Sequence, residues 1–345
     1  MNHRAARHRR QHDSANAGTS HSSWRRALAE AVSEPDELLR LLGLDRSLLP
    51  DVEQGRRLFS LRVPHSYLAR MRHGDPNDPL LRQVLPVAHE AKRTSGFRMD
   101  PVGDMDAMTV PGVLHKYRGR VLLVATGACA VHCRYCFRRH FPYRQANAAR
   151  DGWQAALDYL RSDTSIREVI LSGGDPLMVS DRQLASLVAR LEGVDHIERL
   201  RLHTRLPVVL PERVDSALLG WLEQTALQCV VVIHSNHANE LAGEVATALT
   251  HLRQTGATLL NQAVLLRGVN DTPEALAGLS ESLFAVGVLP YYLHLLDPVQ
   301  GAAHFQVEVP EARRLLEGLR ERLPGYLVPR LVQEVAGAGA KQPIL

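Results

Sequence analysis

From residue 121 onward, short apolar runs alternate with amphipathic segments, and this alternation constrains the fold more than any other feature of the chain. The apolar runs predict strands at residues 121–125, 168–171, 200–203, 229–233, 258–266 and 291–296. The segments between them, residues 153–161, 181–191, 214–225, 239–254 and 273–286, carry apolar residues at helical spacing. Such alternation is typical of βαβ units and of a parallel sheet that is covered on both faces.

Six predicted strands are too few for a closed eight-stranded barrel. We therefore expect an α/β fold with an open, partial (β/α)6 barrel, and a doubly wound sheet is the alternative. The segments of the chain are expected to be a disordered basic tail at 1–23, a helical region at 24–108, the core barrel at 109–305 and a C-terminal segment at 306–345. Several prolines divide the later part of the helical region into turns.

Polar and glycine-rich segments follow the predicted strands. They lie at residues 127–139, 172–176, 203–205, 234–240, 267–271 and 297–298. The active sites of parallel barrels and sheets lie at the carboxyl ends of the strands. We therefore expect these six segments to meet at one rim and to form a single site.

Three of the four cysteines, Cys129, Cys133 and Cys136, form a C-x3-C-x2-C pattern directly after the first predicted strand. Thiolates bind iron and zinc well, and three of them can hold a cubane iron–sulfur cluster with one iron left open. The alternative is a zinc site completed by a histidine such as His132. Cys229 lies inside an apolar run, which predicts a buried core residue.

The composition of the chain indicates the cellular compartment and the kinds of partner that we expect for this protein. The clustered cysteines favour a metal site in a reducing cytoplasm over a secreted disulfide scaffold, and no apolar run is long enough to cross a bilayer. The net charge is only +4. Residues 1–23 are basic but lack aromatic residues, so we do not expect nucleic-acid binding. A zinc-stabilised module that uses this tail to bind RNA is the alternative from a different functional class.

The chain resembles the lysine 2,3-aminomutase family of radical S-adenosylmethionine enzymes. The resemblance rests on the cysteine motif through Arg139 and, in the same order as in the family, on residues 171–177, 205–211, 236–240, 261–271 and 291–297. Residues 24 onward, 59–64 and 78–86 resemble one branch, which makes (R)-β-lysine for attachment to translation elongation factor P. The resemblance implies a partial (β/α)6 radical-SAM barrel with a helical N-terminal extension and a short C-terminal cofactor-binding segment.

The resemblance also implies the reaction. It implies a cytoplasmic isomerase that converts (S)-α-lysine to (R)-β-lysine with a [4Fe-4S] cluster, S-adenosyl-L-methionine and pyridoxal 5'-phosphate, in which cofactors carry out the difficult steps. Its expected partners are L-lysine, an electron donor to the cluster and the enzyme that attaches β-lysine to elongation factor P. The alternatives are production of free β-lysine and action on another amino acid. Glutamate would need a cation for its side chain, and the acidic Asp297 argues against it.

Cofactor-binding residues follow from the same resemblance. Pyridoxal phosphate needs a lysine amine, and the chain has only three lysines, Lys92, Lys116 and Lys341. Lys341 follows a run of small residues and matches the family's cofactor lysine, although alanines replace some of the usual glycines. Cys129, Cys133 and Cys136 match the cluster ligands. The expected S-adenosylmethionine site consists of Tyr135, Ser172, Gly173, Gly174, Asp175, His234 and Gln262.

Substrate-binding residues are implied in the same way. Arg138 matches the arginine that binds the substrate carboxylate, which suits the fork of a guanidinium group. Asp297 and Glu334 match the two acidic positions that hold the distal ammonium, and Glu334 is one methylene longer than the aspartate of the free-lysine enzymes. Lys116 and Arg120 are weaker candidates for the cofactor phosphate.

Overall fold

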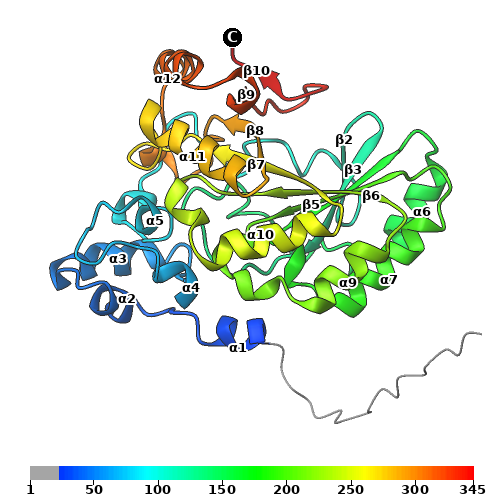
Figure 1. The fold of residues 1–345 in the computed structure, drawn as a ribbon, viewed down its shortest axis with the longest axis horizontal. Coiled ribbons are helices and arrows are strands. Elements are labelled where there is room, and N and C mark those ends of the chain that lie inside the picture. Colours follow the sequence, from blue (N-terminus) through cyan, green and yellow to red (C-terminus); the bar gives the residue numbers. More distant parts are fainter. Residues whose placement is uncertain (1–22) are drawn as a thin grey trace, which may run out of the picture.

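The computed structural model describes residues 23–345, so the predicted tail lies outside the described residues except for Ser23. The N-terminal region of the described residues contains five short α-helices. It contains α1 (Ser23–Ala29), α2 (Pro35–Leu41), α3 (Leu49–Arg56), α4 (His65–Leu68) and α5 (Pro79–Arg82). The last of these begins after Asp78, whose carboxylate accepts hydrogen bonds from the amides of Leu80 and Leu81. These helices lie together on one side of the molecule (Figure 1).

The six predicted strands are all present and parallel. They are β3 (Arg120–Thr126), β4 (Glu168–Gly173), β5 (Arg199–Thr204), β6 (Gln228–Ile233), β7 (Thr258–Val264) and β8 (Leu289–His294). Each strand pairs with the next one in the sequence. In a doubly wound sheet the order of the strands reverses near the centre of the sheet. The uninterrupted sequential order found here therefore confirms the partial barrel and excludes the doubly wound sheet. In the described part of the chain β1 and β10 do not pair with each other, and the barrel is open.

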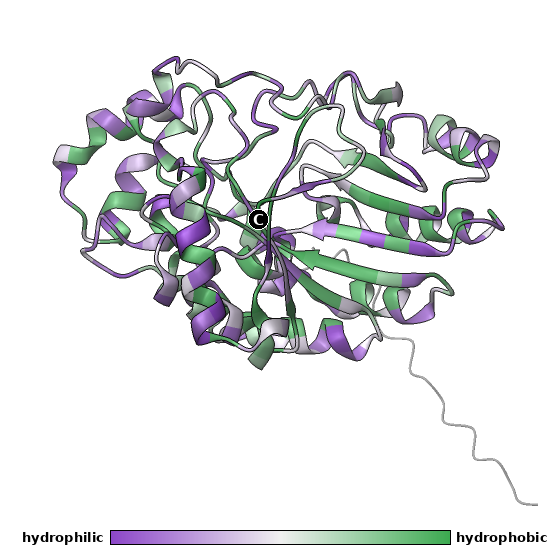
Figure 2. Ribbon diagram, turned by 90° about the horizontal axis from the view of Figure 1, so that it is seen from above, coloured by the Kyte–Doolittle hydropathy of each residue, from purple (hydrophilic) through white to green (hydrophobic). Residues whose placement is uncertain are grey.

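Five helices connect these strands at the predicted positions. They are α6 (Gln154–Ser162), α7 (Asp181–Glu192), α9 (Ser216–Gln224), α10 (Glu244–Gln254) and α11 (Pro273–Ala285). In α7 the buried residues are Leu184, Leu187, Val188 and Leu191, which fall on one face of the helix. Burial of each such leucine contributes about 1.5–3 kcal/mol. The helices cover the outside of a largely apolar sheet (Figure 2).

The sheet is larger than the sequence predicted. β9 (Arg330–Gln333) adds a seventh parallel strand beside β8, preceded by α12 (Val309–Arg322). β1 (Met108–Val110) and β2 (Val113–Tyr117) extend one edge and β10 (Gln342–Pro343) the other, all in antiparallel pairing. These strands are short, and β9 has only two buried residues, Leu331 and Val332. A pattern of two apolar residues is too weak to predict a strand.

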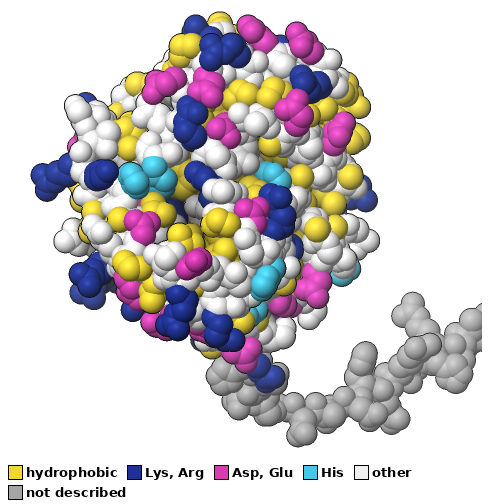
Figure 3. All heavy atoms as spheres, turned by 90° about the vertical axis from the view of Figure 1, so that its left-hand side faces the viewer, with side chains coloured by type: hydrophobic (Ala, Val, Ile, Leu, Met, Phe, Trp, Pro, Cys, Tyr) yellow, Lys and Arg dark blue, Asp and Glu magenta, His cyan; other side chains and the backbone are white. Residues whose placement is uncertain are grey.

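On one face of the described residues, side chains of both charges are mixed. The face that carries the N-terminal helices shows basic and acidic side chains interspersed with apolar ones (Figure 3). A nucleic-acid-binding face would instead gather lysine and arginine. Within residues 23–345 no helix is both long and apolar enough to span a membrane.

Candidate active site

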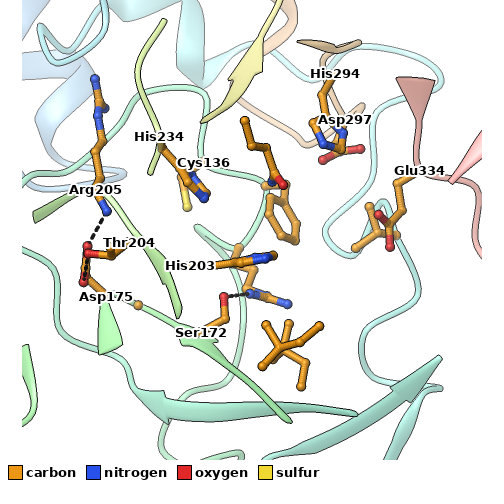
Figure 4. A pocket seen from close by; sticks show the side chains of 18 of the residues that line it. Cys136, Ser172, Asp175, His203, Thr204, Arg205, His234, His294, Asp297 and Glu334 are labelled. Atoms are coloured by element: carbon orange, nitrogen blue, oxygen red, sulfur yellow. Dashed lines mark hydrogen bonds between the residues drawn. The ribbon is translucent and has the colours of Figure 1, made fainter. Parts of the chain in front are cut away.

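The barrel contains one cavity of about 410 Å³ that reaches the carboxyl ends of the parallel strands. All fourteen residues predicted for the site line it: Cys129, Cys133, Tyr135, Cys136, Arg138, Ser172, Gly173, Gly174, Asp175, His234, Gln262, Asp297, Glu334 and Lys341. Figure 4 shows Arg205, Thr204 and Asp175 at one end of this space and Asp297, His294 and Glu334 at the other. Residues more than 200 positions apart in the sequence therefore share one site.

The cysteine loop follows β3, and its three thiols are free and partly buried. Thiolates bind iron well, and the three cysteines of this loop line the same cavity. In a cubane cluster each thiolate ligand binds a different iron. The donor set therefore fits a cluster.

Each thiol of the loop has a different electrostatic environment. Burial raises the pKa of Cys129 well above its usual value, and the backbone amide of Asp175 acts in the opposite direction. Burial likewise raises the pKa of Cys136 to about 11, against the amide of Arg138. The Cys133 sulfur accepts a 2.7 Å hydrogen bond from Arg205 Nη1. Cys133 is thus held by a charged donor.

Gly173 and Gly174 bring the end of β4 against this loop. A Cβ on Gly174 would lie 2.4 Å from the carbonyl oxygen of Ala128. Gly173 has φ +114, which favours glycine, and its Cβ would lie 2.8 Å from the carbonyl oxygen of Thr126. The two glycines are therefore needed for the chain itself to approach the cysteine loop.

Asp175 is buried and its carboxylate is fully occupied. It accepts hydrogen bonds from Thr204 Oγ1 (2.7 Å) and from the amides of Leu177 (3.1 Å), Arg205 (2.7 Å) and Leu206 (3.0 Å). Burial raises the pKa of Asp175, although these donors favour its ionised form. In the structure Asp175 joins the ends of β4 and β5, and its contact with S-adenosylmethionine stays a prediction.

Arg138 is positioned by a residue that the sequence analysis did not identify. Its Nε donates to Asp104 Oδ2 at 2.6 Å and its Nη1 to Ser172 Oγ at 3.2 Å. Asp104 also pairs with Lys116 at 2.6 Å. Burial raises the pKa of Asp104, but the two cations outweigh burial and lower it overall. A buried carboxylate thus fixes the guanidinium of Arg138.

Lys341 and Glu334 meet at the C-terminal end of the sheet. Lys341 Nζ lies 2.8 Å from Glu334 Oε2, and Glu334 Oε1 accepts from Tyr117 OH at 2.8 Å and lies 3.4 Å from Lys116 Nζ. Burial raises the pKa of Glu334, but both ammonium groups and these hydrogen bonds outweigh burial and bring it to about 2. Glu334 is ionised and already paired before any ligand binds.

Asp297 differs from Glu334. Within residues 23–345 its carboxylate forms neither an ion pair nor a hydrogen bond, although it lines the cavity. Burial and the nearby charge of Glu334 raise the pKa of Asp297 to about 7, against the opposing effect of Lys341 and Lys116. An unpartnered carboxylate of this kind can pair with a cationic group.

Three histidines line the cavity, and only His234 was predicted. The Nε2 atoms of His203, His234 and His294 are buried without a hydrogen-bond partner among the described residues. Burial lowers the pKa of His234 to about 4 and those of the other two well below the usual value. Because the rings are neutral at pH 7, each Nε2 atom can donate or accept one hydrogen bond with a bound molecule, depending on the tautomer.

Comparisons with known proteins agree with this site. Residues 117–200, which include the three cysteines, match the model of the 4Fe-4S single cluster domain. The chain is 49% identical to the L-lysine 2,3-aminomutase of Escherichia coli, over 94% of this chain and 95% of that protein. It is 48% identical to that of Haemophilus influenzae, over 91% and 93%, and 34% identical to that of Clostridium subterminale, over 94% and 78%.

Identity near one half extends over more than nine tenths of this chain and of each of two relatives. The match includes the cysteine loop and the strands that bring it to the cavity. The chain belongs to the lysine 2,3-aminomutase family of radical S-adenosylmethionine enzymes, which are isomerases.

Proposed function

We propose that this protein is a pyridoxal-phosphate-dependent 2,3-aminomutase that converts (S)-α-lysine to (R)-β-lysine, and that its product serves the modification of elongation factor P. One observation carries the proposal. A single cavity is lined by the three cysteines, the amine of Lys341, the guanidinium of Arg138 and the unpaired carboxylate of Asp297. Groups of both charges suit a substrate with a carboxylate and a distal ammonium.

The substrate-binding roles rest on the partners that each side chain already has. Arg138 Nη2 has no partner among the described residues, since Asp104 and Ser172 occupy Nε and Nη1. Arg138 can therefore bind a carboxylate without losing its support. Asp297 has no cation to release, whereas Glu334 would have to give up Lys116 or Lys341. We therefore assign the distal ammonium to Asp297 first, with Glu334 as a second contact.

The residues also fit pyridoxal phosphate, which when bound gives the migrating nitrogen a conjugated system to cross. Lys341 would hold it through its amine, and Glu334 keeps that amine in place at 2.8 Å. Arg120 lines the same cavity, and it has no ion pair among the described residues. It would meet the phosphate together with Lys116, because arginine suits phosphate oxygens.

The cluster end of the cavity fits the other two groups. Cys129, Cys133 and Cys136 would hold a [4Fe-4S] cluster, which supplies one electron to S-adenosylmethionine. Tyr135, His234 and Gln262 would contact the nucleoside, and the unpartnered ring nitrogen of His234 supports this role.

The first test is analysis of the product. We expect (R)-β-lysine after anaerobic incubation of the reconstituted protein with L-lysine, S-adenosylmethionine, pyridoxal phosphate and dithionite, measured by chiral chromatography and mass spectrometry. Omission of any cofactor should remove the product. Glutamate in place of lysine should give no β-amino acid, because Asp297 would repel its side-chain carboxylate. A loaded enzyme that converts glutamate and not lysine would contradict the proposal.

The link to elongation factor P needs its own measurement. The attaching enzyme should add the reaction product to elongation factor P, and the factor's mass should rise accordingly. If β-lysine forms but is never transferred, the alternative of a free-lysine aminomutase holds.

Binding of lysine should weaken as the pH falls through 7. Asp297 has a pKa of about 7, so its carboxylate is charged above this pH and neutral below it. We expect the preference for lysine over norleucine, which lacks the ε-amine, to fall about tenfold from pH 8 to pH 6. Glu334, with a pKa of about 2, stays ionised throughout this range.

The measurement is equilibrium binding by calorimetry to the protein free of pyridoxal phosphate, in which Lys341 keeps the ammonium charge that acts on Asp297 and Glu334. Norleucine corrects for the titration of the α-amine, which both ligands share. The matched control is Asp297→Asn, which should show a small preference that does not vary with pH. If its preference keeps the same pH dependence, a group other than Asp297 binds the ammonium.

A further inference from the structure

Arg205 occupies a position that the proposed reaction does not yet explain. It follows β5 and precedes α8 (Leu206–Val209), and it is 6% exposed. Its amide donates to Asp175 Oδ2 at 2.7 Å, and the same carboxylate holds Thr204 and Leu206. Figure 4 shows Arg205 and Asp175 at the same end of the cavity. The backbone at Arg205 is therefore tied to the end of β4.

The guanidinium of Arg205 bridges a proposed cluster ligand and a buried polar network. Nη1 donates to the Cys133 sulfur at 2.7 Å. Nη2 donates to Gln83 Oε1 at 2.7 Å, Glu240 Oε1 at 2.9 Å and Tyr67 OH at 3.1 Å. Tyr67 and Gln83 belong to the N-terminal region, so this region reaches the cluster site through Arg205. The orientation of Nη1 toward the sulfur is thereby fixed.

Cys133 is distinguished by this contact. Among the described residues, only Arg205 brings a charged side-chain donor within hydrogen-bond distance of one of the three sulfurs. Charge-assisted hydrogen bonds are roughly twice as strong as neutral ones, and salt screens a buried contact weakly.

Glu240 opposes this charge from the other side of the guanidinium. It is fully buried and also accepts from Gln83 Nε2 at 2.7 Å and from the Asn236 amide at 2.9 Å. Arg205 contacts the Cys133 sulfur through Nη1, and Glu240 contacts Arg205 through the other terminal nitrogen, Nη2. The positive charge is therefore the nearer one to the cluster position, and the carboxylate moderates its effect.

We propose that Arg205, held by Glu240, sets the reduction potential of the cluster through its hydrogen bond to the Cys133 sulfur. The inference rests on the proposed cluster at Cys129, Cys133 and Cys136. Reduction adds one electron from a low-potential donor such as dithionite, taking [4Fe-4S]²⁺ to [4Fe-4S]⁺. A cation at a ligand sulfur stabilises the more negative state, because hydrogen bonds and net charge govern cluster potentials. Arg205 thus makes the cluster easier to reduce.

The test is potentiometry of the reconstituted cluster, with the reduced form measured by electron paramagnetic resonance. In Arg205→Gln the reduced-to-oxidised ratio at a fixed potential should fall about tenfold, which is a shift of about 59 mV to lower potential for one electron. Glu240→Gln should shift the potential in the opposite direction, since it removes the opposing charge. Arg205→Lys keeps the charge and should lie between the wild type and Arg205→Gln.

The matched control is Arg213→Gln. Arg213 is also fully buried, and it donates to Leu177 O and Asp181 without touching a sulfur. Its removal should leave the potential unchanged. Iron and sulfide contents, measured on every variant, separate a change of potential from a loss of cluster.

Two results would overturn the inference. One is a fully loaded Arg205→Gln variant with the wild-type potential. The other is a shift of Arg205→Gln and Glu240→Gln in the same direction, which would show a general distortion of the buried network. If Arg205→Gln takes up no cluster, the directions of the potential shifts in Glu240→Gln and Arg205→Lys still decide whether the inference holds. Either result leaves the proposed function intact, whereas a wild-type protein without iron would remove both.

Discussion

Replacing Cys129, Cys133 or Cys136 with alanine should abolish the cluster and all turnover. The anaerobically reconstituted wild type should be brown, with about four iron and four sulfide per chain. Each variant should lose the colour and the visible absorption, because an alanine leaves one corner of the cluster without its thiolate. Iron, sulfide and β-lysine are the quantities to measure, and the expected activity of each variant is at background.

Cys229 supplies the matched control for these variants. It lies on β6, packs against the apolar core and does not line the cavity. Cys229→Ala should therefore keep the full iron and sulfide content. A wild-type protein that contains one zinc and takes up no iron on reconstitution would refute the cluster and favour the zinc-stabilised module.

Borohydride reduction of the loaded protein should attach pyridoxal phosphate permanently to Lys341. We expect one labelled peptide in a proteolytic digest, which mass spectrometry would identify as the C-terminal one. Lys341→Arg should carry no label, and its turnover should fall at least about a hundredfold, the lower range for removal of a group that takes part in catalysis. Arginine keeps a positive charge beside Glu334, so the fold of this segment should survive.

The other two lysines test the assignment. Lys92 is exposed and lies outside the cavity, so Lys92→Arg should be labelled as the wild type is. Lys116 lines the cavity but is engaged by Asp104 and Glu334. A label on Lys116 in place of Lys341 would show that the C-terminal segment does not hold the cofactor.

Sequence patterns predicted the barrel because short apolar strands alternate regularly with amphipathic helices. In β4 five of six residues are buried, and a continuous apolar run of this length is typical of a strand inside a parallel sheet. The same pattern could not reveal β9 or β10, where pairing with a neighbouring strand supplies the stability and the local sequence contributes little. Yet these two short strands flank Glu334 and Lys341 and bring them to the cavity.

Motifs identified residues whose chemistry is unusual, such as three clustered cysteines or a lysine in an arginine-rich chain. They did not identify partners. Asp104 sits in a loop with no recognisable pattern, and its importance appears only where it meets Arg138 and Lys116. The role of Arg205 likewise depends on Cys133, Gln83 and Glu240, which are dozens of positions away.

The sequence by itself determined the order of the six central strands and their helices and the family, and it predicted which residues bind iron, an aldehyde cofactor or a charged substrate. Only the tertiary structure decided which of these charges are already neutralised. Glu334 is paired and Asp297 is not, although both are carboxylates predicted for one role. The reason is physical: a pKa or an ion pair depends on burial and on distances of a few ångströms, and the folded chain sets these by bringing distant segments together.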